Sequence, residues 1–63
     1  MGKKELRKRV RSLEQRIHEH GTKILTERAR PRPDAGRVRH WEAEIKAFRE
    51  AINRARKRLG ELE

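Results

Sequence analysis

Two prolines close together, Pro31 and Pro33, constrain the fold of this chain more than any other feature of its sequence. A proline inside a helix lacks the N–H that would donate to the preceding turn, and its ring clashes with that turn. Each proline also pushes the residue before it towards extended backbone. We therefore expect a loop over residues 28–34, with Asp34 accepting backbone N–H groups at the start of a new helix.

Apolar residues on both sides of this loop follow a helical period. Their spacings alternate between three and four residues, with one fault before the loop, where His20 takes the place of an apolar residue. This repeat of about 3.5 residues is typical of helices that pack along a single seam. The expected helix–helix contacts are Leu6, Val10, Leu13, Ile17, His20, Ile24, Trp41, Ile45, Phe48, Ile52, Ala55 and Leu59.

The sequence predicts an all-α fold, an antiparallel two-helix hairpin with a coiled-coil-like seam. Helices are expected over residues 4–27 and 35–60, with Gly60 near the end of the second, and residues 1–63 are interpreted as one helical-hairpin module. Neither segment alternates with period two, so no strand is predicted. A chain folded at the loop places Ile17 opposite Phe48 and Leu13 opposite Ile52.

The expected core is small. Only 32% of the 63 residues are hydrophobic, and no cysteine is present to form a disulfide. Two helices that meet along one seam leave each core side chain open on one side, and small scaffolds usually need a further stabilising element. We expect a second chain to supply it, either as two hairpins in a four-helix bundle or as a larger protein or ribonucleoprotein partner.

Positive charge concentrates at the two ends of the expected hairpin. The chain has 19 Lys and Arg against 10 Asp and Glu, a formal net charge of +9. Residues 1–11 carry six cations against one acid, and residues 54–63 carry four against two, so the end where they meet has a net charge of +7. Residues 28–39 around the loop carry five cations against one acid.

The seam pairing also predicts which charged residues face each other. It places Arg7 near Arg56 at the open end, and Arg9 is expected near Arg58 in the same way; these like charges repel. In the middle of the hairpin it places Glu14 near Arg49, and a second complementary pair is expected between Lys23 and Glu44. A chain selected only for folding would not concentrate repulsion at one end, so the pattern favours an anionic partner there.

Thirteen of the 19 cations are arginine, whose guanidinium group matches phosphate oxygens in a bidentate way. The one Trp and the one Phe both lie on the seam, so no platform for stacking bases is predicted. We therefore expect contact with the phosphate backbone of RNA, such as ribosomal RNA, or of DNA. The predicted nucleic-acid-binding residues are Lys3, Lys4, Arg7, Lys8, Arg9, Arg11, Arg54, Arg56, Lys57 and Arg58, with Arg30 and Arg32 at the loop.

Two other interpretations of the charge stay open. The cations can form a solvated face that keeps the chain soluble, or a basic docking surface for an acidic protein. In either case the hairpin is a protein–protein interaction or oligomerisation module with charged ends. A ridge of Ala43, Ala47, Ala51 and Ala55 fits the close approach of another helix, although alanine is also the best helix former.

No residue pattern predicts catalysis, a metal or a cofactor. His18 and His20 are two residues apart and so point to different sides of a helix. Ser12, Thr22 and Thr26 have no base at a recognisable spacing, and the glycines are isolated. We expect a protein that is not an enzyme and binds no cofactor or metal ion.

The histidine on the seam has two interpretations. His20 stands beside Ile45, where a polar residue can set the register of the helices, as an asparagine does in coiled coils. It can also act as a pH-sensitive position, at which protonation weakens association.

The sequence predicts neither a membrane span nor a signal peptide. No run of about 18 apolar residues is present, and no apolar segment follows the basic start. Basic amphipathic helices can bind anionic lipid, but here the apolar stripe is narrow and pairs with itself. We expect no membrane insertion and a cytoplasmic location.

Two stretches on either side of the loop carry a resemblance to a known group of proteins. The first runs from Ser12-Leu13-Glu14 to Lys23-Ile24, and the second from His40-Trp41-Glu42 to Phe48. Together they resemble a short helical segment found in bacterial polymorphic toxin proteins. The resemblance implies an interaction or accessory segment and carries over no catalytic residue.

Overall fold

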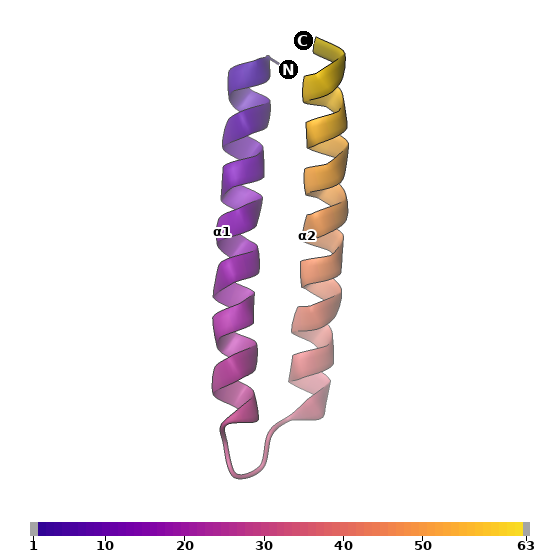
Figure 1. Ribbon diagram of the computed structural model, residues 1–63. Coiled ribbons are helices and arrows are strands. Elements are labelled where there is room, and N and C mark those ends of the chain that lie inside the picture. The colour runs from indigo at the N-terminus through magenta and orange to yellow at the C-terminus, as the bar shows by residue number, and fades with distance from the viewer. Residues whose placement is uncertain (1, 63) are drawn as a thin grey trace.

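The computed structural model describes residues 2–62, and these form two long helices joined by a loop. Helix α1 spans Lys3–Arg28 and helix α2 spans Ala35–Leu62. They run antiparallel, so the start of α1 and the end of α2 lie at the same end of the molecule (Figure 1). The Cα trace measures 49 × 14 × 13 Å. The predicted all-α hairpin is confirmed, and the described residues contain no strand.

Local hydrogen bonds explain where α1 begins and ends. The N–H of Gly2 donates to Oε2 of Glu5 at 3.4 Å, which ties the entry to the first turn. At the other end the N–H of Ala29 donates to the carbonyl of Leu25 at 3.1 Å. Helix α1 therefore includes residues 3 and 28, one more at each end than the hydrophobic pattern indicated.

Asp34 and Gly60 behave differently at the two ends of α2. Oδ1 of Asp34 accepts the N–H of Arg37 at 3.1 Å, as expected of a residue that caps a helix. Gly60 does not end the helix, which continues to Leu62. A glycine inside a helix costs only about 1 kcal/mol relative to alanine, and Gly60 keeps a negative φ.

The hydrophobic core follows the seam between the helices. Its partly buried members Leu13, Ile17 and Leu59 pack against a buried cluster near the open end. None of the described side chains is less than 2% exposed, because each has a neighbouring helix on one side only. The buried apolar residues are Leu6, Val10, Ile24, Val38, Ile52 and Ala55.

The middle of the seam is aromatic and polar. The ring of His20 meets the ring of Phe48 edge to face, with centroids 5.3 Å apart and planes at 82°. Trp41 and Ile45 are half-buried on the same side of α2. His20 therefore packs within the seam, where its ring contacts Phe48.

Neither helix, over the residues described, is long and apolar enough to cross a lipid bilayer.

Candidate functional site

The open end of the hairpin brings together ten of the predicted cationic residues. The first turns of α1 lie beside the last turns of α2 (Figure 1). All ten side chains are exposed. We call this set the open-end cluster, and it consists of Lys3, Lys4, Arg7, Lys8, Arg9, Arg11, Arg54, Arg56, Lys57 and Arg58.

Like charges from the two helices share hollows on the surface of this end. Arg7 and Arg56 border one hollow, together with Glu14. A second hollow is bordered by Arg9 and Arg58. The two members of each expected repulsive pair thus border the same hollow. One pair lies on each side of the seam.

Ion pairs engage a minority of the open-end cluster. Arg56 pairs with Glu14 at 3.5 Å across the helices, and Arg58 pairs with Glu61 at 3.5 Å along α2. Within the described part of the chain, no ion pair involves the other cations of the cluster apart from Arg7, which has an interaction of its own. These unpaired cations are Lys3, Lys4, Lys8, Arg9, Arg11, Arg54 and Lys57.

The pairing of Glu14 differs from the expected one. The sequence pattern placed Glu14 near Arg49, whereas its ion pair is with Arg56. Residues 49 and 56 are seven apart and flank the seam on the same side of α2, with Glu14 opposite the stretch between them. Long Glu and Arg side chains can extend in either direction along the helices, so the seam spacing alone does not determine which arginine pairs with Glu14.

At the loop, the predicted cation Arg30 has a structural partner. Its Nη1 donates to Oε1 of Glu27 at 3.3 Å. The second oxygen of Glu27 accepts the backbone N–H of Asp34 at 2.9 Å. Glu27 therefore closes the loop by binding both of its ends, while the predicted cation Arg32 is exposed.

Sequence reasoning missed Glu27, which is only 4% exposed. The N–H of Asp34 holds the pKa of Glu27 below its ordinary value, and Arg30 and Arg37 act in the same direction, while burial opposes them. A signal was present, since Glu27 follows Ile24 by three residues and so stands at the next seam position.

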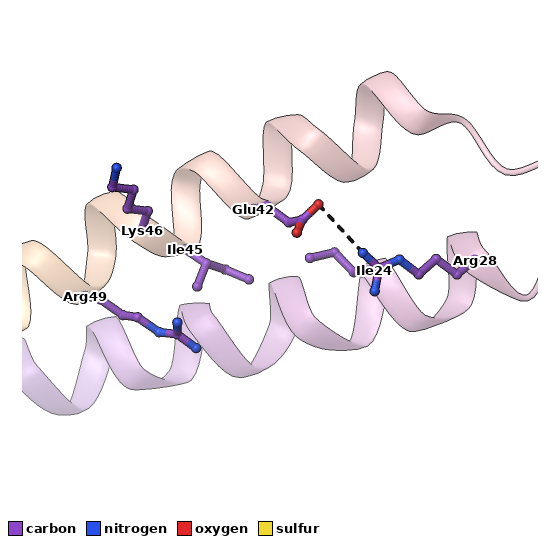
Figure 2. Close-up of a pocket in the computed structure, with 6 residues that line it drawn as sticks. All are labelled: Ile24, Arg28, Glu42, Ile45, Lys46 and Arg49. Atoms are coloured by element: carbon purple, nitrogen blue, oxygen red, sulfur yellow. Dashed lines mark ion pairs between the residues drawn. The ribbon is translucent and has the colours of Figure 1, made fainter.

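Two further ion pairs hold the loop end. Arg28 reaches from α1 to Glu42 of α2, with Nη2 and Oε1 3.7 Å apart (Figure 2). Arg37 lies 3.9 Å from Asp34. Three of the five cations near the loop, Arg28, Arg30 and Arg37, are thus tied to carboxylates.

The Arg28–Glu42 ion pair borders a shallow hollow between the helices (Figure 2). Ile24 of α1 and Ile45 of α2 point toward one another along it. Arg49 extends from α2 towards α1 farther from the loop. The hollow is open to solvent, and its lining combines these two apolar side chains with charged ones.

Glu44 connects two histidines near the middle of the hairpin. Its Oε2 lies 3.1 Å from Nε2 of His20, and its Oε1 lies 2.6 Å from Nε2 of His40. The hydrogen bond with His20 lowers the pKa of Glu44, with smaller contributions from His40 and Lys23, while burial opposes them. Lys23 is thus close enough to Glu44 to affect its ionisation.

This arrangement does not provide a metal centre. Nδ1 of His20 is buried without a hydrogen-bond partner among the described residues, and Glu44 already occupies the other ring nitrogen. In the part of the chain that the structure describes, no three or more His, Cys, Asp or Glu side chains are grouped so that they could hold a metal ion.

Comparison with known proteins finds no match to a family model, a curated protein or a solved structure. The resemblance to a helical segment of polymorphic toxin proteins therefore stays a prediction.

Proposed function

We propose that this hairpin binds the phosphate backbone of RNA or DNA through its open-end cluster, without catalysing a reaction. The observation that supports this most strongly is the set of seven unpaired Lys and Arg side chains gathered from both helices at one end. The residues that we assign to the contact are those of the open-end cluster, with Arg32 as an additional contact at the loop.

The local electrostatics favour an anionic partner at this position. Lys3 and Lys4 lie in the first turn of α1, where the helix dipole favours negative charge. Arg9 and Arg58 border one hollow, where like charges repel. A polyanion bound here turns both unfavourable interactions into favourable ones.

The chemistry of the cluster favours recognition of charge and shape over recognition of sequence. Arginine forks bind phosphate oxygens bidentately, and lysine acts as a point charge. Phe48 packs against His20, and Trp41 is half-buried, so neither aromatic residue forms an exposed stacking surface. Phosphate contacts fix position but carry no sequence information.

A salt titration tests the proposal. The full chain is mixed with fluorescently labelled duplex DNA and structured RNA, and anisotropy is measured between 50 and 200 mM salt. Because each phosphate contact releases counterions, seven contacts predict a slope of about −6 in log K against log salt for a duplex. No binding at 50 mM salt, or a slope near zero, would remove nucleic acid as the partner.

The exposed core favours a second candidate function, self-association as a protein–protein interaction module. Leu13, Ile17 and Leu59 are only partly buried, and Leu25 is 71% exposed. A second hairpin that covers these side chains would add hydrophobic burial at about 25 cal/mol per Å² of apolar surface.

Sedimentation equilibrium tests this second candidate. A stable oligomer whose mass does not change on adding duplex DNA favours the interaction module over nucleic-acid binding. A monomer that melts sharply near 60 °C at micromolar concentration would show that the hairpin needs no partner chain.

A further inference from the structure

Three cations on α1 lie on one long line beside the seam. Arg9, Arg16 and Lys23 are seven residues apart, and all three are exposed. Seven residues make nearly two helical turns, so side chains at this spacing share one face and follow one another at steps of about 10.5 Å. Arg16 and Lys23 lie outside the open-end cluster and continue its charge towards the loop.

Contacts with neighbouring groups place these three residues on one edge of the hairpin. Arg9 and Arg16 border a common hollow on α1. Across the seam, Arg9 shares a hollow with Arg54 and Arg58 of α2. Further along, Lys23 is close enough to Glu44 of α2 to lower its pKa. We call these five cations, Arg9, Arg16, Lys23, Arg54 and Arg58, the basic edge.

The other edge of the hairpin carries charges that are paired across the helices. Arg56 binds Glu14 at 3.5 Å, and Arg28 binds Glu42 at 3.7 Å. Figure 2 shows the second pair, and Arg49 and Lys46 border the same hollow as this pair. Cations of one edge thus form ion pairs between α1 and α2, whereas the cross-helix pair along the basic edge, His20 with Glu44, involves none of its five cations.

The carboxylates along the basic edge are already engaged. Glu5, which borders the hollow of Arg9 and Arg16, accepts the N–H of Gly2 at 3.4 Å. Glu44 binds His20 and His40 through its two oxygens. Arg9, Arg16, Lys23 and Arg54 form no ion pair within the described range, residues 2–62.

A straight row of fixed charges selects a partner that is itself stiff. From Arg9 to Lys23 the row spans about 21 Å of helix, more than half of the 34–36 Å of one turn of a nucleic-acid duplex. A flexible single strand must lose conformational entropy to follow such a row. Stacking on exposed aromatic rings, which compensates single strands for that loss, is not available on this edge.

We infer that the phosphate contact continues from the open end along the basic edge, and that the partner is a double helix lying alongside the hairpin. This inference rests on the proposed function and adds to it the surface used and the form of the nucleic acid. Arg16 and Lys23 become contact residues, and the paired edge faces away from the partner.

The test compares two double variants that remove equal charge from opposite edges. One carries Arg16→Gln and Lys23→Gln on the basic edge, and its matched control carries Lys46→Gln and Arg49→Gln on the paired edge. All four positions are exposed in helices, and glutamine has a helix propensity close to that of lysine and arginine. Circular dichroism of each variant establishes that the hairpin is intact.

Binding is measured by anisotropy with a 12-base-pair DNA duplex, a 12-base-pair RNA duplex and the corresponding single strands. Against either duplex, the basic-edge variant is expected to lose roughly tenfold in affinity at 150 mM salt and about two units of salt slope. The control is expected to lose less than threefold. Both wild-type duplexes are expected to bind more tightly than the single strands.

The contrary outcomes are distinct. Equal losses in the two variants would show that net charge alone matters, and an unchanged basic-edge variant would confine the contact to the open end. Either result overturns the inference and leaves the proposed function in place. Single strands that bind as tightly as duplexes overturn the choice of partner. Failure of the wild-type chain to bind every probe overturns the proposed function itself.

Discussion

The two ends of the hairpin use the same type of residue in opposite ways. At the loop end, arginines bind carboxylates that hold the fold, as Arg30 does with Glu27 and Arg28 with Glu42. At the open end, Lys4, Lys8 and Arg11 lie exposed, and no described carboxylate pairs with them. A count of basic residues does not distinguish cations that hold the fold from cations that are available to a partner. The position of the nearest carboxylate does distinguish them.

This difference separates structural charge from charge available to a partner. A cation already bound to a carboxylate must break that ion pair before it can bind phosphate. A cation without such a partner loses only its hydration and counterions, and counterion release favours binding. The open end is therefore the better candidate for polyanion binding, although both ends are basic.

The largest effect is expected when unpaired charge is removed from the open end. The triple variant Lys8→Gln, Arg9→Gln and Arg54→Gln should weaken binding to duplex DNA on the order of 100-fold at 100 mM salt. Its salt slope should fall by about 2.7 units, because each lost phosphate contact removes about 0.9. Fluorescence anisotropy measures both quantities.

The matched control removes three charges from the loop end, by Arg28→Gln, Arg37→Gln and Arg39→Gln. We expect it to weaken binding less than fivefold, since the open-end cluster is intact. Equal losses for the two triple variants would break the comparison between the ends and show that total charge governs affinity.

The second prediction concerns the carboxylate that closes the loop. Glu27→Ala removes the acceptor of the Asp34 N–H and the partner of Arg30, so the melting temperature at pH 7 should fall by about 5 °C. Glu50→Ala, at an exposed position of α2, is the control and should change it by less than 2 °C. Thermal unfolding followed by circular dichroism checks both values.

The pH dependence of this effect has a definite sign. The pKa of Glu27 in the folded chain lies below its ordinary value, chiefly because Asp34 donates to it. Its contribution to stability is therefore present above the ordinary glutamate pKa, about 4.3, and is lost as the pH falls through the lower folded pKa. The difference between wild type and Glu27→Ala should narrow between pH 6 and pH 2. A difference that stays constant would contradict the role given to the charge.

The third prediction concerns the middle of the seam, between the two ends. His20→Leu replaces a ring with a buried, unpartnered Nδ1 by an apolar side chain at a seam position. We expect the free energy of unfolding to rise by about 1 kcal/mol and the melting temperature by about 5 °C. A lower melting temperature would show that the contacts of His20 with Glu44 and Phe48 outweigh the cost of the unpartnered nitrogen.

The smallest effect is expected for an ion pair on the surface. Glu14 and Arg56 are 55% and 61% exposed, and a double-mutant cycle with Glu14→Gln and Arg56→Gln should give a coupling free energy of about 0.5 kcal/mol or less. Urea denaturation measures it. A coupling above about 1 kcal/mol would show that the open end, too, depends on ion pairs for its stability.

The fold could be read from the sequence because two strong local signals agree. Pro31 and Pro33 set the break, and the spacing from Leu6 to Ile24 matches the spacing from Trp41 to Leu59, so the hairpin and its seam follow. The helix ends were harder to place. Gly60 reads as a terminator, but the hydrogen bonds of α2 continue through it to Leu62.

The contacts of charged side chains could not be read from the sequence in the same way. Glu27 stands at a seam position, which indicates burial, but its partners depend on the loop bringing Asp34 and Arg30 to its two oxygens. Glu14 has arginines within reach in both directions along α2, and only the three-dimensional arrangement selects Arg56. The partner at the open end is a separate molecule. Composition and residue spacing indicate that this partner is anionic, and they carry no information on its other properties.

The one-sided closure of the hairpin has a consequence for its motion. Glu27 fastens the helices at the loop. Helix–helix contacts near the loop close the shortest stretch of chain and are expected to form first, and contacts at the open end close the longest stretch and are expected to form last. The first turn of α1, which carries Lys3 and Lys4 and lies beyond the buried cluster of Leu6 and Ala55, is therefore expected to fray first. A bound polyanion would fasten that end as Glu27 fastens the other, so protection of its amide hydrogens from exchange should rise most where the charges are unpaired.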